Sequence, residues 1–283
     1  MKQRYKQVYG TTETKPMALV DTVAGRILSI IAYTDAPYHD LTHTLSVITV
    51  GQQILEGQQR LEGQVTPRDW VNITTALMFH DAGYIKGACR EDRVEAHRYA
   101  TGIDEMLVFL DPQTTDASLA PYHINRGQRI AKEMLQDYGD IDLEVVQAAI
   151  EFTRFPVPPH PVYQDNIGYF GLVRAADLIG QLADPAYLER LPDLFEELAE
   201  TGIAAALGYH HPADLRAAYP QFFREVVYPY IQPALLYLNV TPQGRQTVER
   251  LYTNLARSEY PEPSGVGISD FCQIFIDDCG QML

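Results

Sequence analysis

Two short fragments early in the chain bring together residue types that bind metal ions. The first is Tyr38-His39-Asp40-Leu41-Thr42-His43, and the second is Phe79-His80-Asp81-Ala82-Gly83-Tyr84. An adjacent His and Asp inside an apolar stretch are costly to bury unless a partner binds them, and a divalent metal is the commonest such partner. A further carboxylate in an apolar setting, Asp177, follows later. The ordered set of His, His-Asp and Asp therefore predicts a divalent metal site.

Three predicted helices must position these side chains. Each of the three candidate ligands continues an apolar stripe at helical spacing. His43 precedes Val47, Val50 and Ile54, and His80 follows Trp70, Ile73 and Leu77. Asp177 follows Phe170 and Val173. A core-facing helical position normally carries an apolar side chain. Because three separate helices each place an ionisable residue there, we expect all three to face one centre.

Helix start signals recur along the chain. Thr66-Pro67 with an acidic residue at Asp69 is typical of a capped N-terminus. Another helix is predicted from Asp140 or Asp142 to about Thr153. The pairs Asp184-Pro185 and Thr241-Pro242 are each expected to open a further helix.

Strand patterns are nearly absent. Prolines make residues 155–162 an extended loop, and no run of alternating polarity bounded by turns predicts a strand. The sequence therefore predicts an all-α fold. We expect one domain over residues 1–257, with its metal-binding core at about 35–190, followed by a linker and a short terminal helix over 258–283.

Composition narrows the partners and the compartment. The 283 residues are 46% apolar and 21% charged, which is typical of a soluble globular protein, and the net charge is −15. Such a charge repels nucleic acid and anionic membranes, although a bound metal reverses the field locally and admits a small phosphorylated substrate. The N-terminus has no signal-peptide pattern, no apolar run is long enough to span a bilayer, and the three cysteines lack disulfide-framework spacing. The expected location is the cytoplasm.

The ordered motifs resemble those of the HD-domain metal-dependent phosphohydrolase superfamily. Tyr38-His39 with His43 is similar to the first motif of the cyclic-nucleotide phosphodiesterases, and Ala175-Ala176-Asp177-Leu178 with Asp184-Pro185 is similar to their distal motif. The segment 148–153 looks like the helix that precedes the distal Asp in HD proteins. The resemblance implies an HD-domain-like helical bundle with additional C-terminal helices.

The same resemblance implies roles for individual residues. The ligands of the first metal would be His43, His80, Asp81 and Asp177. Two imidazoles and two carboxylates suit a divalent ion such as Mn, Fe, Zn, Ni or Mg, and Asp81 leaves open a bridge to a second, more weakly held ion. A metal-activated water would attack phosphorus. His39, one turn before His43, would be the general acid, and Glu95 is the preferred carboxylate to support the ligands.

Other candidates carry weaker signals, and the pattern departs from the phosphodiesterases in places. Glu91 and His97 follow the doublet, and His123 and His160 would be either ligands of a second metal or polar residues of surface loops. Lys86 and Arg126 would contact a phosphate, and His210-His211 lies at a helix boundary. Asp40 stands where the phosphodiesterases have Asn, and Gly83-Tyr84 replaces the acid and His that commonly follow the doublet.

The expected function is hydrolysis of a phosphomonoester or phosphodiester of a nucleotide or another small metabolite. Two alternatives stay open. A diiron oxygenase would need His97, His123 or His160 to converge on a second iron, and a non-enzymatic protein would use the same site to sense a ligand. A homo-oligomer also stays open.

Overall fold

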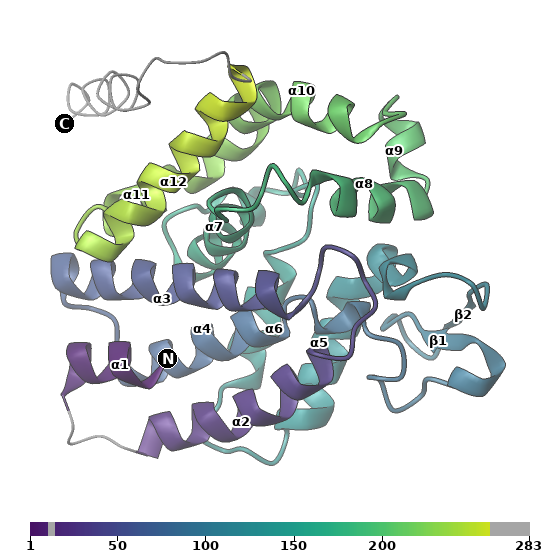
Figure 1. The fold of residues 1–283 in the computed structure, drawn as a ribbon. Coiled ribbons are helices and arrows are strands. Elements are labelled where there is room, and N and C mark those ends of the chain that lie inside the picture. The colour runs from purple at the N-terminus through teal and green to yellow at the C-terminus, as the bar shows by residue number, and fades with distance from the viewer. Residues whose placement is uncertain (11–14, 261–283) are drawn as a thin grey trace.

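The fold is known from a computed structural model, which describes residues 1–10 and 15–260 (Figure 1). Helices account for 67% of the described residues and strands for 3%, which confirms the all-α prediction. The α-helices are α1 (Lys2–Tyr9), α2 (Lys15–Ile31), α3 (Leu41–Glu62), α4 (Pro67–Phe79), α5 (His123–Leu135), α6 (Leu143–Glu151), α7 (Tyr169–Leu182), α8 (Leu191–Glu200), α9 (Ile203–Ala206), α10 (Pro212–Phe222), α11 (Tyr228–Leu238) and α12 (Pro242–Glu259).

Shorter elements connect these helices. They are the 3-10 turns η1 (Ala82–Tyr84), η2 (Val94–Ala96), η3 (Asp116–Tyr122) and η4 (Pro161–Gln164), the π-helical turn η5 (Phe223–Val227), and the strands β1 (Arg98–Ala100) and β2 (Leu107–Phe109). Among the described residues, no helix is both long enough and apolar enough to cross a membrane.

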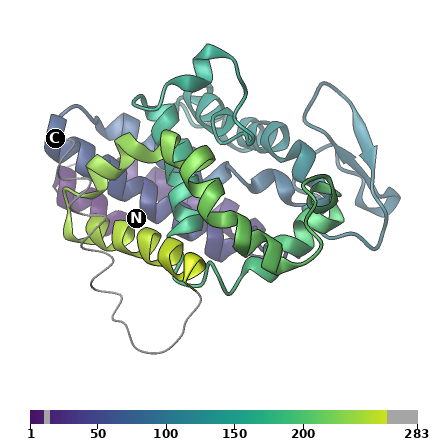
Figure 2. The ribbon, with the colours of Figure 1, turned by 90° about the horizontal axis from the view of Figure 1, so that it is seen from above.

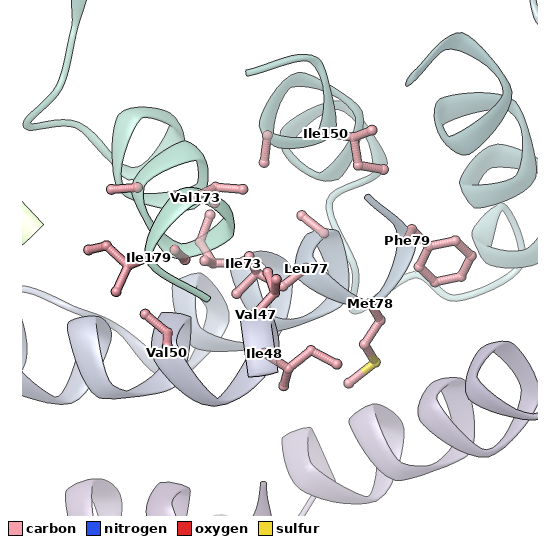
Figure 3. Packing of buried hydrophobic residues seen from close by; sticks show 14 of the residues in the cluster. Val47, Ile48, Val50, Ile73, Leu77, Met78, Phe79, Ile150, Val173 and Ile179 are labelled. Carbon is pink, nitrogen blue, oxygen red and sulfur yellow. The ribbon is translucent and has the colours of Figure 1, made fainter. Parts of the chain in front are cut away.

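Helix α3 lies at the centre of the packing. It contacts α7 most extensively and also packs on α4 and α11, while α4 packs in turn on α2 and α6 (Figure 1). Figure 3 shows Val47 of α3, Leu77 of α4 and Val173 of α7 among the labelled side chains of the core. The three stripes predicted from the sequence thus meet in one hydrophobic cluster, whose burial is the main stabilising term.

A glycine sets the close approach of α3 and α7. A Cβ at Gly180 would lie 2.8 Å from Val47 Cα, which is too close for any larger residue without movement of the backbone. Ser46 Oγ then reaches across and donates to the Gly180 carbonyl at 2.8 Å. Because His43 precedes Val47 by one turn and Asp177 precedes Gly180 by almost one turn, this contact also brings His43 and Asp177 together.

The sequence did not predict the hairpin of β1 and β2. Arg98 pairs with Phe109 and Ala100 with Leu107 in an antiparallel ladder, and the hairpin lies at one end of the molecule in both views (Figures 1 and 2). Strands of three residues are too short to show a reliable period-two pattern, which explains why no strand was predicted there.

Three of the predicted helix starts are confirmed and one is wrong. Thr66 and Asp69 form the expected capping box of α4. Asp142 caps α6, and Thr241 caps α12. The helix expected from Asp184-Pro185 was wrong: a turn follows, and α8 begins only at Leu191.

The end of the chain is described only in part. Helix α12 continues to Glu259, past the expected domain end at residue 257. The expected terminal helix falls in residues 261–283 and lies outside the described residues.

Candidate metal centre

The start of α3 sets the first side chain of the candidate centre. Asp40 caps the helix, and its Oδ1 accepts a hydrogen bond from the His43 backbone N–H at 2.9 Å. Arg190 Nη2 donates to the other oxygen, Oδ2, at 3.1 Å. Asp40 is therefore occupied by structural contacts, while the His43 side chain is buried on the inward face of the helix.

The end of α4 sets the His-Asp doublet. His80 follows the last helical residue, and its Nδ1 lies 2.8 Å from the Leu77 carbonyl oxygen. Because a carbonyl only accepts, Nδ1 carries a proton, and in the neutral ring Nε2 keeps the lone pair that a metal ligand needs. Asp81 comes next, at the turn into η1, and is also buried.

Helix α7 contributes the last carboxylate. Asp177 stays 22% exposed, whereas His43, His80 and Asp81 are almost fully buried. Asp177 is therefore the most exposed of the four side chains.

The four side chains converge at ligand spacing. The Nε2 atoms of His43 and His80 lie 3.1 and 3.0 Å from Asp81 Oδ2, and 3.6 and 3.5 Å from Asp177 Oδ1. The two nitrogens are 3.5 Å apart. Ligands about 2.0–2.2 Å from a tetrahedral zinc ion are roughly 3.4 Å from one another. His43 and His80, together with either carboxylate, therefore have the donor types and the spacing that suit a divalent ion.

The charges of the cluster also fit a cation. Asp81 Oδ2 is buried and has no hydrogen bond of acceptable geometry, although two imidazoles face it. Burial opposes a charged imidazole, but the nearby carboxylates of Asp177 and Asp81 outweigh it and raise the pKa of His43 to about 9. Burial likewise opposes a charged Asp81, yet the adjacent His80 holds the Asp81 pKa well below its usual range. Without a cation, protons must neutralise the two carboxylates.

His39 lies beside the cluster and is held by a buried glutamate. A ring nitrogen of His39 lies within 4.8 Å of the ligand atoms of His43 and Asp81. His39 Nδ1 pairs with Glu197 Oε2, while Glu197 Oε1 accepts the backbone N–H groups of His39 at 2.9 Å and Tyr38 at 2.6 Å. Burial opposes the charge on Glu197, but the nearby His39 lowers its pKa overall. Glu197 thus fixes both the backbone and the ring of His39.

Two rings follow His39 in a stack. The rings of His39 and Tyr84 have centroids 4.5 Å apart and an interplanar angle of 11°. On Tyr84 lies His123, at 4.6 Å and 26°. His123 Nδ1 is 2.5 Å from the Ala120 carbonyl, and burial lowers the His123 pKa.

The structure does not bring the other sequence candidates into this cluster. Within the described ranges, the groups of three or more potential ligands draw only on His39, His43, His80, Asp81 and Asp177. The preferred supporting carboxylate, Glu95, is exposed in η2. The remaining candidates are His97, which packs on Phe109, His160 and His211, which cap η4 and α10, and Glu91, which pairs with Arg129.

Neither cation suggested as a phosphate contact is free to act as one. Lys86 Nζ donates to the Thr114 carbonyl at 2.5 Å. Arg126 is fully buried, pairs with Asp92 at 2.9 Å and donates to backbone carbonyls, including that of Gly83 at 2.6 Å. Both side chains hold the segment after the doublet in place.

Sequence reasoning missed Glu197, although a signal was present. Leu191, Leu194 and Leu198 form an apolar stripe in α8, and Glu197 lies three residues after Leu194 on the same side. It is an ionisable residue at a core-facing position, which is the criterion that identified His43, His80 and Asp177.

The described residues define an all-α protein with a largely buried cluster of His and Asp side chains at metal-ligand spacing. Compared with known proteins, the sequence matches the Npun_R2479-like family over residues 1–261, so the chain belongs to that family. No match was found among curated proteins or among solved structures.

Proposed function

We propose that this protein is a metal-dependent phosphohydrolase acting on a small phosphorylated metabolite such as a nucleotide. The observation that carries the proposal is the convergence of His43 in α3, the His80-Asp81 doublet after α4 and Asp177 in α7, with the imidazole nitrogens 3.0–3.6 Å from the carboxylate oxygens. The resemblance of these residues and their order to the HD-domain phosphohydrolases supports the same reaction class.

A divalent cation bound by these four residues would supply an activated water and offset negative charge on the phosphoryl oxygens. The protein itself supplies the proton for the departing group. His39 lies next to the ligands with Nδ1 engaged by Glu197, so its Nε2 is the atom that would give a proton to the leaving oxygen. The Glu197 carboxylate stabilises the charged imidazole until that transfer, as carboxylates do for catalytic histidines.

The surroundings favour a small substrate. Since the net charge is −15, an extended phosphate backbone would be repelled.

We also propose a cytoplasmic location, because the three cysteines have no disulfide-framework spacing and Cys89 is a free, buried thiol.

The alternative functions receive less support. A diiron oxygenase would need additional histidines at the centre, yet His97 and His160 lie elsewhere, on Phe109 and at the start of η4. A ligand sensor would use the same cation site without turnover, and the test below separates it from an enzyme.

The test compares the two histidines of the first motif. The purified protein is loaded with manganese, nickel, magnesium, iron or zinc and screened against 4-nitrophenyl phosphate, bis(4-nitrophenyl) phosphate and a nucleotide panel. His43→Ala should lose metal and activity together. His39→Ala should keep its metal but turn over roughly a hundredfold to ten-thousandfold more slowly, the usual contribution of a general acid.

Exposed His210, before α10, provides the matched control, and His210→Ala should leave both readouts unchanged. A metal-loaded wild type with no activity on any substrate would reject the enzyme proposal and favour the sensor. Loss of metal in His39→Ala would make His39 a ligand.

A further inference from the structure

Tyr84 occupies an unusual place next to the candidate centre. Its ring is buried between two imidazoles, His39 on one face and His123 on the other. The near-parallel stack, with centroids 4.5 Å apart and planes at 11°, places the Tyr84 ring against one face of the His39 ring. Neither the metal ligands nor the proton transfer described above uses Tyr84.

The backbone on both sides of Tyr84 is clamped. Arg126 Nε donates to the Gly83 carbonyl at 2.6 Å, and Arg126 Nη2 donates to the Ile85 carbonyl at 2.8 Å. The guanidinium is held in turn by Asp92, whose Oδ1 and Oδ2 lie 3.0 and 2.9 Å from Nη1 and Nη2. A buried ion pair with these extra hydrogen bonds fixes the position of the turn.

The turn is also packed against α5 without clearance. A Cβ at Gly83 would lie 1.8 Å from the His123 carbonyl oxygen, so only glycine permits this contact. The start of α5 therefore presents the His123 ring to the outer face of Tyr84. The Arg126 hydrogen bonds and the Gly83 contact thus fix the backbone around Tyr84, and the two imidazoles lie on the two faces of its ring.

From this geometry we propose that Tyr84 is a positioning residue for His39. Glu197 holds the His39 ring through Nδ1, and Tyr84 fixes the plane of the ring from its face, so that Nε2 stays directed at the leaving oxygen. The inference rests on the proposed hydrolase function. It assigns the effect to the aromatic ring of Tyr84 and not to its hydroxyl.

Kinetics of two substitutions test this role. The wild type and the variants are assayed for kcat on two substrates, the phenyl and the 4-nitrophenyl ester of the phosphate type (monoester or diester) that the wild type hydrolyses. Tyr84→Leu should lower kcat on the phenyl substrate by roughly 10- to 100-fold, because a small misplacement of a catalytic group has such an effect. The 4-nitrophenyl substrate, whose leaving group needs little protonation, should lose less, and KM and metal content should not change. Tyr84→Phe keeps the ring and should behave as wild type.

A double substitution shows whether Tyr84 acts through His39. Tyr84→Leu should cause no further loss in a His39→Ala background, since residues that act as a unit are not additive. An additional loss in that background would overturn the proposal. So would a Phe variant as slow as the Leu variant, because the hydroxyl would then be the active group.

A measurement without turnover separates this inference from the enzyme proposal. In the zinc-loaded protein, the Tyr84 ring should shift the C–H proton resonances of His39 upfield, and His39→Ala identifies those signals by their loss. The shift should persist in Tyr84→Phe and disappear in Tyr84→Leu. If the wild type is inactive but the shifts follow this pattern, the hydrolase proposal fails and the positioning contact stands. Identical His39 signals in the wild type and Tyr84→Leu would overturn the contact itself.

Discussion

Glutamate 197 offers a way to separate the structural and chemical roles of one buried side chain. Its Oε1 accepts two backbone N–H groups, those of Tyr38 and His39, and its Oε2 pairs with His39 Nδ1. In Glu197→Ala the buried N–H of Tyr38 and the half-buried N–H of His39 lose their acceptor. At up to about 1–3 kcal/mol each, this loss should lower the free energy of unfolding by roughly 2–6 kcal/mol. Glu197→Gln keeps one oxygen for the two N–H groups and should be much less destabilised.

The Gln variant should still lose activity. It replaces the carboxylate beside His39 Nδ1 with a neutral amide and removes a charge-assisted hydrogen bond of about 1.5–3 kcal/mol. If that bond stabilises the proton-donating imidazole, kcat on a substrate with a poor leaving group should fall by roughly 10- to 150-fold. Urea unfolding of the metal-free protein and steady-state kinetics of the metal-loaded protein measure the two effects.

The adjacent Glu196 is exposed on the same helix and gives a matched control, Glu196→Gln, which should change neither quantity. Full activity of Glu197→Gln on a poor leaving group would refute the role given to the carboxylate. Unchanged stability of Glu197→Ala would refute the hydrogen bonds themselves.

Two further predictions concern the cluster and the helices that carry it. The pKa of His43 is about 9 in the folded protein against 6.5 for a free imidazole, so protonation of His43 stabilises the cation-free protein fully below pH 6.5 and progressively less as pH rises toward 9. Because a metal competes with that proton, the rise in Tm on adding zinc should grow between pH 6.5 and 9. A rise in Tm that stays constant over this interval would contradict the linkage. Gly180→Ala should separate α3 from α7, lower Tm and weaken metal binding. The control is Gly25→Ala, in an exposed part of α2 where a Cβ would meet no neighbouring atom within 4 Å, and it should raise helix stability by about 1 kcal/mol. Equal changes of Tm for the two substitutions in differential scanning fluorimetry would reject the close-packing account.

The sequence was most informative where one local rule was broken. His43, His80 and Asp177 each interrupt an apolar stripe, and the structure buries the stripes together. Periodicity depends on residues within a few turns of one another, so it survives without knowledge of the fold. The capping box of α4 was readable for the same reason.

What the sequence could not provide depends on distant contacts. Glu197 meets His39 across 158 positions, and no local pattern connects the two residues. The region of Glu95 and His97 carries no strand pattern, yet the buried pair of Asp92 and Arg126 ties it into a turn and a hairpin. Tertiary contacts here override local preference.

The most direct test of the metal centre is the metal content of purified protein, measured by inductively coupled plasma mass spectrometry after removal of free ions. The wild type and the His210→Ala control should each carry about one divalent ion per chain. His80→Ala and Asp81→Ala should carry almost none and should be less stable, because the surviving ligands become buried polar groups without their partner. Full occupancy in both variants would contradict the assignment of His43, His80, Asp81 and Asp177 as the metal ligands.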